Sequence, residues 1–510
     1  MSTPNENIEH VEIAIVGTGF SGLAMAHRLK QKGREDFVLL EKADDVGGTW
    51  RDNTYPGIAC DVPSNLYSFS FALNPNWSAS YSGGREIWDY IRDVAKKFDL
   101  LRHVRFNSGA KRAEWDNARQ LWRLETEAGP MTARFLIGGM GPLSMPQIPD
   151  LPGIDSFEGE SFHSAHWNHD YDLSGKRVAV IGTGASAIQF VPHIQKQVAQ
   201  LNLFQRTPPW ILPRSSRKLT NFEHKLFKYL PFTQRIVRGL VYSMLELRVV
   251  GFVKQQRVMR LIQPIAKLNI RRHIKDKALR KKVTPNYTIG CKRVLMANDY
   301  YPAIAQPNVN VITAGVREVR ANSVIDADGN EHEVDAIIWG TGFHVTENPE
   351  WDNLIGRDGR TLTETWAERG MEAYLGMQAA NFPNTFLMIG PNSGLGHSSM
   401  VYMIESNVDY IEQAIDFAER PGVGSIEISR AALDEFEQEI QSRMKGTIWT
   451  SGGCSSWYLD ANGRNTTLWP DFTFVYRRRC RDFDPARLVV RAPGDAADDV
   501  SPDVPVETPV

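Results

Sequence analysis

Two stretches of this sequence repeat one pattern of apolar and polar positions. Residues 11–16 form a β-branched run that ends in a glycine-rich turn, and a helical pattern leads from there to a second apolar run at residues 37–40. Residues 177–181 begin the same order, which ends in an apolar run at residues 201–204. Strand, glycine turn, helix and strand in this order are typical of a βαβ unit with a parallel sheet. The pattern therefore predicts an α/β protein with two such units.

The segment between residues 213 and 288 has a different, helical pattern. Its apolar residues recur three to five positions apart, for example Ile236, Leu240, Leu245, Val249 and Phe252. We therefore expect a helical insertion that interrupts the second unit.

Breaks in the pattern divide the chain into six segments. Proline and glycine cluster around residue 149, and the end of the chain is rich in proline and acids without periodicity. The expected order is the first unit (1–149), the second unit (150–212), the helical insertion (213–288), the rest of the second unit (289–373), the rest of the first unit (374–490) and a disordered tail (491–510).

Charge is balanced over the whole chain but not along it. The 58 Lys and Arg residues nearly match the 60 Asp and Glu residues, which excludes a generally basic nucleic-acid binder and a strongly acidic disordered protein. Residues 214–282, however, contain 19 Lys and Arg residues and only three acids. The predicted helical insertion is therefore strongly basic.

The cysteines and the apolar runs indicate the cellular location of the protein. The four cysteines lie far apart without a C-x-x-C pair, so neither a disulfide framework nor a zinc site is expected. The N-terminus lacks the basic and apolar regions of a signal peptide. The most apolar stretch, residues 239–253, contains two charges and is shorter than the ~20 apolar residues of a membrane span. The expected location is the cytoplasm.

The first glycine turn has the chemistry of a dinucleotide site. Gly17, Gly19 and Gly22 have the G-x-G-x-x-G spacing, which lets the backbone approach a pyrophosphate at the start of a helix. Glu41 follows the second strand, where a carboxylate can accept a hydrogen bond from a ribose 2′-hydroxyl. These residues predict a site for an adenosine diphosphate with a free ribose, such as FAD.

The second glycine turn, which contains Gly182 and Gly184, repeats the first with one change. Twenty-four residues separate Gly182 from Arg206, as they separate Gly17 from Glu41. An arginine at this position suits a 2′-phosphate. The second turn is therefore predicted to bind NADPH.

Two dinucleotide units together indicate a flavoprotein that takes hydride from NADPH. Pyridine-nucleotide disulfide reductases share this plan, but they need a redox-active cysteine pair soon after the first unit. Cys60 is the only cysteine in that part of the sequence, so this class is not favoured.

A fingerprint between the two units narrows the class. Phe157, Gly159, His163 and Trp167 have the spacing F-x-G-x-x-x-H-x-x-x-W. Followed by Pro or Asp, this spacing is typical of the type I Baeyer–Villiger monooxygenases, a class B flavin monooxygenase family that the chain resembles over nearly its whole length. The chain departs from the fingerprint at Asn168. The resemblance places these residues in the linker between the domains, and we expect a structural role for His163 rather than a catalytic one.

A second motif resembles the segment that runs beneath the flavin in this family. It reads G-G-T-W at residues 47–50, Y-P-G at residues 55–57, and then Asp61. The resemblance implies that Trp50 packs beside the isoalloxazine ring and that Asp61 reaches the side of the reaction. The alternative role for Asp61 is to cap a turn.

A third motif, G-C-K-R at residues 290–293, resembles the family's cation pair. The resemblance implies that Lys292 binds the 2′-phosphate of NADPH with Arg206 and Thr207, and that Arg293 lies over the flavin. Reduced flavin and O2 give an anionic C4a-peroxide, which attacks a ketone to form an anionic adduct. A fixed cation in a dry site stabilises both anions, and Asp61 would orient it. Arg293 and Asp61 are therefore the expected catalytic residues.

Three further segments resemble the family. Residues 335–343 form an apolar strand and a turn that carries Thr341 and Gly342, and an apolar strand at residues 386–389 precedes the turn with Asn392. His397 follows that turn and lies either beside the flavin ring or at the N-terminus of a helix. Trp457 resembles the tryptophan that meets NADP+, with a buried core residue as the alternative.

These motifs define the residues expected to bind the two cofactors, and no metal is expected. The residues are Gly17, Gly19, Phe20, Ser21, Gly22, Glu41, Lys42, Gly48, Thr49, Trp50, Tyr55, Asp61, Tyr67, Gly182, Thr183, Gly184, Ser186, Gln189, Arg206, Thr207, Lys292, Thr341, Gly342, Asn392 and Trp457.

The resemblance implies two Rossmann-like domains, one for FAD and one for NADPH, with the helical insertion in the NADPH domain. It implies an enzyme that uses NADPH and O2 to convert ketones into esters or lactones, with sulfoxidation as a side activity. One alternative is a class B enzyme that acts mainly on sulfur or nitrogen, which Trp167, Asp61 and Arg293 disfavour. The other is a flavin redox module that oxidises NADPH without oxygenation. The expected partners are a small ketone and O2, without nucleic acid, in a monomer or a small homo-oligomer.

The basic insertion has three interpretations. Its charge would attract polyanionic NADPH if it lined the cofactor entrance. Its apolar stripe, residues 240–252, would let it attach to an anionic membrane surface. The favoured interpretation is a packed helical lid with a solvated basic face.

Overall fold

The first of two lobes is built on an eight-stranded sheet with β1 (Glu9–Val16) in its interior. The structure is a computed structural model that describes residues 8–495; residues 496–510, most of the tail expected to be disordered, lie outside the described part. β1 pairs in parallel with β2 (Phe37–Leu40) and with β6 (Gly129–Gly138), and α1 (Phe20–Gln31) connects β1 to β2. The other strands of this sheet are β3 (Val104–Arg105), β4 (Ala110–Asp116), β5 (Leu121–Thr126), β17 (Leu354–Ile355) and β18 (Thr385–Leu387).

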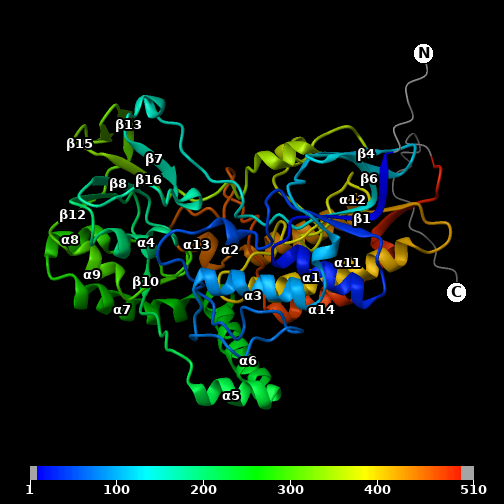
Figure 1. The fold of residues 1–510 in the computed structure, drawn as a ribbon, viewed down its shortest axis with the longest axis horizontal. Coiled ribbons are helices and arrows are strands. Elements are labelled where there is room, and N and C mark those ends of the chain that lie inside the picture. The colour runs from blue at the N-terminus through cyan, green and yellow to red at the C-terminus, as the bar shows by residue number, and fades with distance from the viewer. Residues whose placement is uncertain (1–7, 496–510) are drawn as a thin grey trace.

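The second lobe contains a five-stranded parallel sheet, which lies beside the first lobe in Figure 1. Its strands, in spatial order, are β12 (Val309–Ile312), β9 (Gln200–Phe204), β8 (Arg177–Ile181), β16 (Ala336–Trp339) and β7 (Glu160–His163). The inner strands are buried over almost their whole length, because helices and the neighbouring segments cover both faces of a parallel sheet. The predicted α/β class with two parallel βαβ units is confirmed.

Late segments of the chain complete the first lobe. β18 pairs in parallel with β6, and α11 (Met400–Ala418) packs against α1. The chain thus returns to the first sheet after it has built the second. The other helices outside the insertion are α2 (Thr49–Asp52), α3 (Gly84–Lys97), α4 (Ala187–Ile194), α9 (Tyr300–Ile304), α10 (Leu362–Ala367), α11 (Met400–Ala418), α12 (Arg430–Met444), α13 (Ile448–Ser451) and α14 (Thr473–Arg481).

Two small sheets lie outside the central ones. One is antiparallel and consists of β13 (Val316–Arg320), β14 (Ser323–Asp326) and β15 (Glu331–Glu333). The other pairs β19 (Ser425–Ile428) with β20 (Leu488–Arg491).

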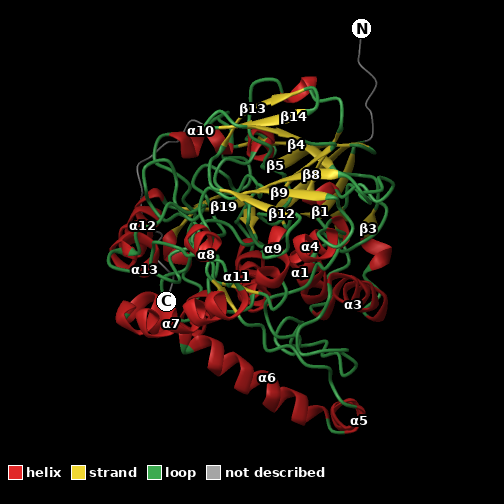
Figure 2. Cartoon of the chain, turned by 90° about the vertical axis from the view of Figure 1, so that its left-hand side faces the viewer, coloured by secondary structure: helices red, strands yellow, loops and turns green. Residues whose placement is uncertain are grey.

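The helical insertion leaves and rejoins the second lobe through a two-stranded stem. β10 (Ile211–Leu212) pairs in parallel with β11 (Leu295–Met296). Between them the chain forms α5 (Asn221–Tyr229), α6 (Pro231–Glu246), a π-helical turn, α7 (Gln256–His273) and α8 (Lys277–Val283). Figure 2 shows α6 extending away from the body of the molecule, with α5 at its end.

The inner face of α6 binds the first lobe through hydrogen bonds and through the apolar side chains of Val241, Tyr242 and Leu245. Gln234 donates hydrogen bonds to Asn65 and Asn74, and Arg238 donates to the carbonyls of residues 65, 66 and 68. Glu246 accepts two hydrogen bonds from Thr473 at 2.8 and 2.9 Å. The insertion therefore contacts the first lobe as well as the lobe from which it extends.

The apolar residues that predicted the insertion do not share one face. Leu245, Val249 and Phe252 are buried, whereas Ile236 and Leu240 are exposed. The prediction of a single apolar stripe is wrong, because hydrogen-bonding residues share the inner face of α6 and part of the apolar pattern points outward.

No helix among residues 8–495 is long and apolar enough to cross a membrane. The longest helix of the first lobe, α11, is buried along most of its length within that lobe, and α7 of the insertion carries many basic residues.

Candidate functional site

The first glycine turn brings the start of α1 against the end of β1. Gly17 has a φ of 97°, and a Cβ on Gly22 would lie 2.0 Å from the carbonyl oxygen of Gly17, so both positions require glycine. The side chains of Phe20 and Ser21 are buried. The first N–H groups of the helix have no acceptor within it and can bind an anion, so these two residues can act only through their backbone.

Glu41 is held in place by the protein itself. Its carboxylate accepts hydrogen bonds from the N–H and the hydroxyl of Thr18 and from the N–H of Ala43, and it forms an ion pair with Arg51 at 2.8 Å. Arg51 was not among the predicted site residues, although it directly follows the G-G-T-W motif. A carboxylate has about four acceptor positions, so a ribose hydroxyl would share or replace one of these donors.

The second glycine turn packs on the T-G segment at the end of β16. Gly182 has a φ of 108°, and a Cβ there would lie 2.3 Å from the carbonyl oxygen of Gly340. Thr183 is buried, Gly184 is exposed, and Ser186 directly precedes α4. The turn is thus open at Gly184, as an approaching pyrophosphate would require.

Two cations lie near each other beside this second turn. Arg206 is exposed at the end of β9, and Lys292 is half-buried. Burial and the positive charge of Arg206 lower the pKa of Lys292. Neither cation pairs with a carboxylate in the described part of the chain. Thr207 is half-buried next to Arg206, so the three residues expected at the 2′-phosphate come together.

An aromatic pair covers the expected flavin segment. The indole N–H of Trp50 donates to the hydroxyl of Tyr67 at 3.1 Å, and the rings meet edge to face with centroids 5.5 Å apart. Gly48, which directly precedes α2, has a φ of 52°. Thr49 and Trp50 are the first residues of α2, so the motif forms one helical turn that is preceded by a glycine.

Tyr55 and Gln189 join the two lobes. The hydroxyl of Tyr55 donates to the side-chain oxygen of Gln189 at 3.0 Å, and the amide nitrogen of Gln189 donates to the carbonyl of Ala59 at 2.9 Å. A Cβ on Gly57 would lie 2.4 Å from the ring of His193 on α4. Burial raises the pKa of Tyr55 to about 12. The Y-P-G motif therefore fixes the first lobe against α4 of the second.

Asp61 and Arg293 form the central ion pair of the site. Nε and Nη2 of Arg293 donate to the two oxygens of Asp61, both at 2.8 Å. The charge of Asp61 raises the pKa of Arg293. Burial alone would raise the pKa of Asp61, but the charge and hydrogen bonds of Arg293 outweigh it and lower that pKa. Both side chains are charged, and each is about 30% exposed (32% for Arg293 and 28% for Asp61).

Arg214 adds a second cation near this pair. Its Nη2 donates to the carbonyl of Cys60 at 2.8 Å, and its guanidinium lies 5.1 Å from the centroid of the Tyr81 ring. Its charge also lowers the pKa of Asp61. No motif points to Arg214, which is notable in the sequence only as the start of the basic segment.

A disulfide bond joins Cys291 to Cys454. This bond corrects the expectation that the cysteines are not disulfide-bonded, while Cys60 and Cys480 are free and buried. The bond connects the loop that contains Lys292 and Arg293 to the loop that precedes Trp457. The two cysteines are 163 residues apart in the sequence.

Trp457 and Tyr458 follow this bond and differ in exposure. Trp457 is 49% exposed, so the alternative of a buried core tryptophan is wrong. Tyr458 is buried, its hydroxyl has no hydrogen-bond partner among residues 8–495, and burial raises its pKa to about 12 although the charge of Arg293 lowers it. Tyr458 therefore lies near Arg293, although it was not among the predicted site residues.

His163 ends β7 and has the surroundings of a structural residue. It is buried, its Nδ1 accepts a hydrogen bond from the N–H of Ala165 at 3.1 Å, and burial lowers its pKa to about 4. Trp167 packs between the rings of Phe162 and Phe190, each centroid 5.2 Å away. The fingerprint thus fixes the end of β7 to α4.

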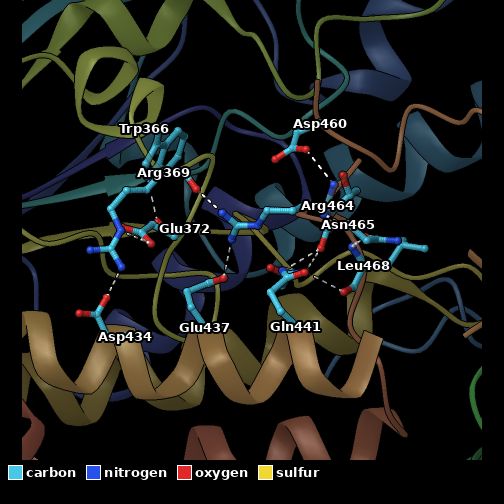
Figure 3. Close-up of polar contacts among 12 residues, drawn as sticks. Trp366, Arg369, Glu372, Asp434, Glu437, Gln441, Asp460, Arg464, Asn465 and Leu468 are labelled. Carbon is cyan, nitrogen blue, oxygen red and sulfur yellow. Dashed lines mark hydrogen bonds and ion pairs between the residues drawn. The ribbon is translucent and has the colours of Figure 1, made fainter. Parts of the chain in front are cut away.

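Asn392 is fixed by the loop that precedes α14. Its side-chain nitrogen donates to the carbonyls of Asn465 at 2.9 Å and Leu468 at 3.1 Å. Figure 3 shows how polar contacts support this loop from α12: Gln441 donates to the carbonyl of Asn465, and Arg464 reaches Glu437. Asn392 is buried, with its side-chain oxygen unpaired among the described residues.

The remaining expected residues lie at the edges of the site. Thr341 donates its hydroxyl to the carbonyl of Gln147, and Gly342 has a φ of 89°. Lys42 is exposed. His397 is buried 3.3 Å from Glu246 of α6 and precedes α11, so it is not part of that helix as one alternative held.

Comparison with known proteins adds a family to this geometry. Residues 10–355 match the flavin-binding monooxygenase-like family. A Baeyer–Villiger monooxygenase of Streptomyces coelicolor is 51% identical over 489 residues, which cover 96% of this chain and 94% of that protein. Cyclohexanone monooxygenase from Rhodococcus, solved with NADP+, has a TM-score of 0.84 at 27% identity and covers 95% of this chain and 100% of its own. The OTEMO complex with FAD and NADP has a TM-score of 0.83 at 27% identity and covers 94% and 99%.

Proposed function

The chain belongs to the flavin-binding monooxygenase-like family, and on this premise we propose that it is an FAD-containing, NADPH-dependent Baeyer–Villiger monooxygenase that converts ketones into esters or lactones. One oxygen atom of O2 would enter the product and the other would leave as water. The observation that carries the proposal is the bidentate pair of Asp61 with Arg293, because it joins the two motifs expected at the reaction side.

The residues of the first glycine turn fit FAD. Gly17 and Gly22 leave no room for a side chain, so a pyrophosphate can reach the first N–H groups of α1. Glu41 presents a fixed carboxylate at the end of β2 for the ribose. Trp50 and Tyr67 form a rigid aromatic wall where the ring system would lie. Bound FAD would take hydride from NADPH and deliver electrons to O2, which supplies the oxygen for insertion.

The residues of the second turn fit NADPH. Gly184 is open to a pyrophosphate, and Arg206 with Lys292 supplies two unpaired positive charges for the 2′-phosphate. A bound phosphate would stabilise the charged amine of Lys292 and so oppose the effect of burial and of Arg206 on its pKa.

Arg293 would stabilise the negative charge that forms on the oxygen being transferred and on the carbonyl oxygen it attacks. Its pKa is raised, so it keeps its charge and does not give up a proton at any working pH. Asp61 occupies two of its donors and fixes the guanidinium plane, which leaves Nη1 directed away from the pair, 3.5 Å from the carbonyl of Leu395. Such preorganised charge is the usual source of large catalytic effects.

A panel of ketones tests this proposal, with NADPH consumption, O2 consumption and product measured together. We expect one ester or lactone for each NADPH and each O2 consumed. Stoichiometric hydrogen peroxide in the presence of every ketone would instead indicate a flavin redox module. Oxygenation of sulfides or amines without any ester would indicate the alternative class B activity.

A further inference from the structure

The helical insertion carries an unusual concentration of exposed apolar side chains. Twelve of the eighteen large hydrophobic side chains that are exposed among residues 8–495 lie between residues 222 and 268. The insertion is also the most basic part of the sequence, with 19 Lys and Arg residues between residues 214 and 282. Exposed apolar surface on this scale marks an interaction site.

The outer face of α6 is one continuous apolar stripe. Phe232, Ile236, Leu240, Met244 and Leu247 recur every three or four positions and are all exposed, Leu240 by 67%. The inner face is hydrogen-bonded to the first lobe through Gln234, Arg238 and Glu246. The helix is therefore fixed with its outer stripe of five apolar side chains toward solvent.

A second stripe runs along α7. Val258, Leu261, Ile265 and Leu268 share one face and are exposed, Leu261 by 76%. Figures 1 and 2 both place α5, α6 and α7 along the lower side of the molecule. The helices that carry the two stripes therefore lie on the same side of the protein.

Positive charges border both stripes. The exposed cations of these helices that have no carboxylate partner among residues 8–495 include Lys225, Lys228, Arg235, Arg257, Arg260 and Lys267. The three acids of the segment are all occupied, because Glu223 pairs with Arg217, Glu246 binds Thr473 and Asp276 caps α8. The surface is thus apolar in the middle and positive at its borders, with no free negative charge.

We propose that this surface, formed by the outer faces of α5, α6 and α7, attaches the protein to an anionic lipid bilayer. The helices would lie in the plane of the interface, with their leucines among the acyl chains and their Lys and Arg residues at anionic headgroups. Charge complementarity selects this occupant over a second copy of the chain, because two copies would bring two strongly positive surfaces together. Attachment of this kind needs no membrane-spanning helix.

Flotation of the FAD-loaded enzyme with vesicles tests the proposal. We expect it to float with phosphatidylcholine vesicles that contain about 30% phosphatidylglycerol, to stay behind with pure phosphatidylcholine, and to be released by high salt, which screens charge beyond about 3 Å at 1 M. The apolar variant carries Leu240→Gln, Leu247→Gln, Leu261→Gln and Leu268→Gln. The charge variant carries Arg260→Glu and Lys267→Glu. Each should lower the bound-to-free ratio by roughly tenfold or more.

The matched control carries Lys111→Glu and Arg119→Glu, an exposed pair at β4 and its following turn on the other side of the molecule in Figure 1. It should float like the unmodified enzyme, and all three variants should keep their rate of NADPH oxidation, which shows that they are folded. Absence of flotation of the unmodified enzyme on the anionic vesicles, or flotation that survives the leucine substitutions, would overturn the proposal. So would a dimer in light scattering that the apolar variant dissociates, because a second copy would then cover the surface.

Discussion

Asp61 and Arg293 are 232 residues apart in the sequence and form a bidentate ion pair. One comes from the segment after α2 in the first lobe, and the other from the loop just before β11 at the stem of the insertion. The pair therefore depends on the correct docking of the two lobes, which Tyr55 and Gln189 also fix. Because the position of Arg293 depends on both lobes, we expect it to act only when the two lobes have assembled.

Replacing Arg293 tests its proposed role in oxygen insertion. Arg293→Ala should keep bound FAD and its reduction by NADPH, but it should lower ester formation by about a hundredfold or more, since a preorganised charge at the reacting oxygens is lost. Anaerobic stopped-flow measures the reduction, and chromatography measures the ester. A normal ester yield would contradict the assigned role.

Asp61→Asn separates charge from orientation. Asparagine accepts one of the two hydrogen bonds from Arg293 but removes the negative charge that raises its pKa and fixes its plane. We expect ester yield per NADPH to fall and hydrogen peroxide to rise, with a smaller loss than in Arg293→Ala. The ratio of ester to peroxide at constant NADPH consumption is the measurement, and an unchanged ratio would show that Asp61 only caps its turn.

Arg206 and Lys292 should determine the preference for NADPH over NADH. Charge-assisted hydrogen bonds are worth about 1.5–3 kcal/mol, so Arg206→Ala should raise the KM for NADPH by roughly tenfold or more while it leaves the KM for NADH nearly unchanged. Lys292→Ala should act in the same direction. Lys196→Ala, which removes an exposed lysine from the same lobe, is the control and should affect neither. Equal effects on the two cofactors would mean that the 2′-phosphate lies elsewhere.

The strands of the two nucleotide units could be predicted closely because burial on both faces leaves a plain apolar run. Residues 37–40 and 177–181 coincide with β2 and β8, and β1 begins two residues before the predicted residue 11. The glycine positions could also be predicted, because the backbone at Gly17 and Gly182 leaves no room for a side chain. These features are local, so neighbouring residues are enough to reveal them.

Features that depend on tertiary packing could not be predicted in this way. The ion pair of Arg51 with Glu41 arises because the turn before α2 brings residue 51 back to the end of β2. The outward direction of Ile236 and Leu240 follows from polar partners on the first lobe, which the period of α6 does not reveal. Cys291 and Cys454 are 163 residues apart in the sequence, and no sequence pattern links them.

The disulfide bond can be tested by counting the free thiols of the protein. Purified without reductant and then unfolded, the protein should show two reactive thiols, from Cys60 and Cys480, and four after reduction. In the folded protein both free thiols should react slowly, because they are buried and burial raises their pKa. Peptide mapping without reduction should recover the peptide pair that contains Cys291 and Cys454. Four thiols in the unreduced, unfolded protein would contradict the bond.

Breaking this bond should loosen the loop that presents Trp457. Cys454→Ser frees that loop from the segment with Lys292 and Arg293, so we expect a higher KM for NADPH, about two- to tenfold, with FAD content unchanged. Cys480→Ser, a change to a buried cysteine outside the bond, serves as the control and should leave the KM unchanged. The same KM in both variants would show that the bond does not position the cofactor loops.

Glu437 should make stability depend on pH near neutrality. Burial and the charge of Glu372 raise its pKa to about 7, and Arg464 offsets only part of this. An acid with a raised pKa holds its proton in the folded protein between pH 4.5 and 7 but loses it when unfolded, so stability falls as pH rises through this range and is fully reduced above pH 7. Glu437→Gln should remove the fall, so the variant gains up to about 3 kcal/mol in free energy of unfolding relative to the unmodified protein between pH 5 and pH 8. Urea unfolding at both pH values measures this gain. Glu435→Gln, on the exposed side of α12, is the control and should show no such gain. The prediction is wrong if Glu437→Gln differs from the unmodified protein by the same free energy at both pH values, because Glu437 would then be ionised in the folded protein throughout.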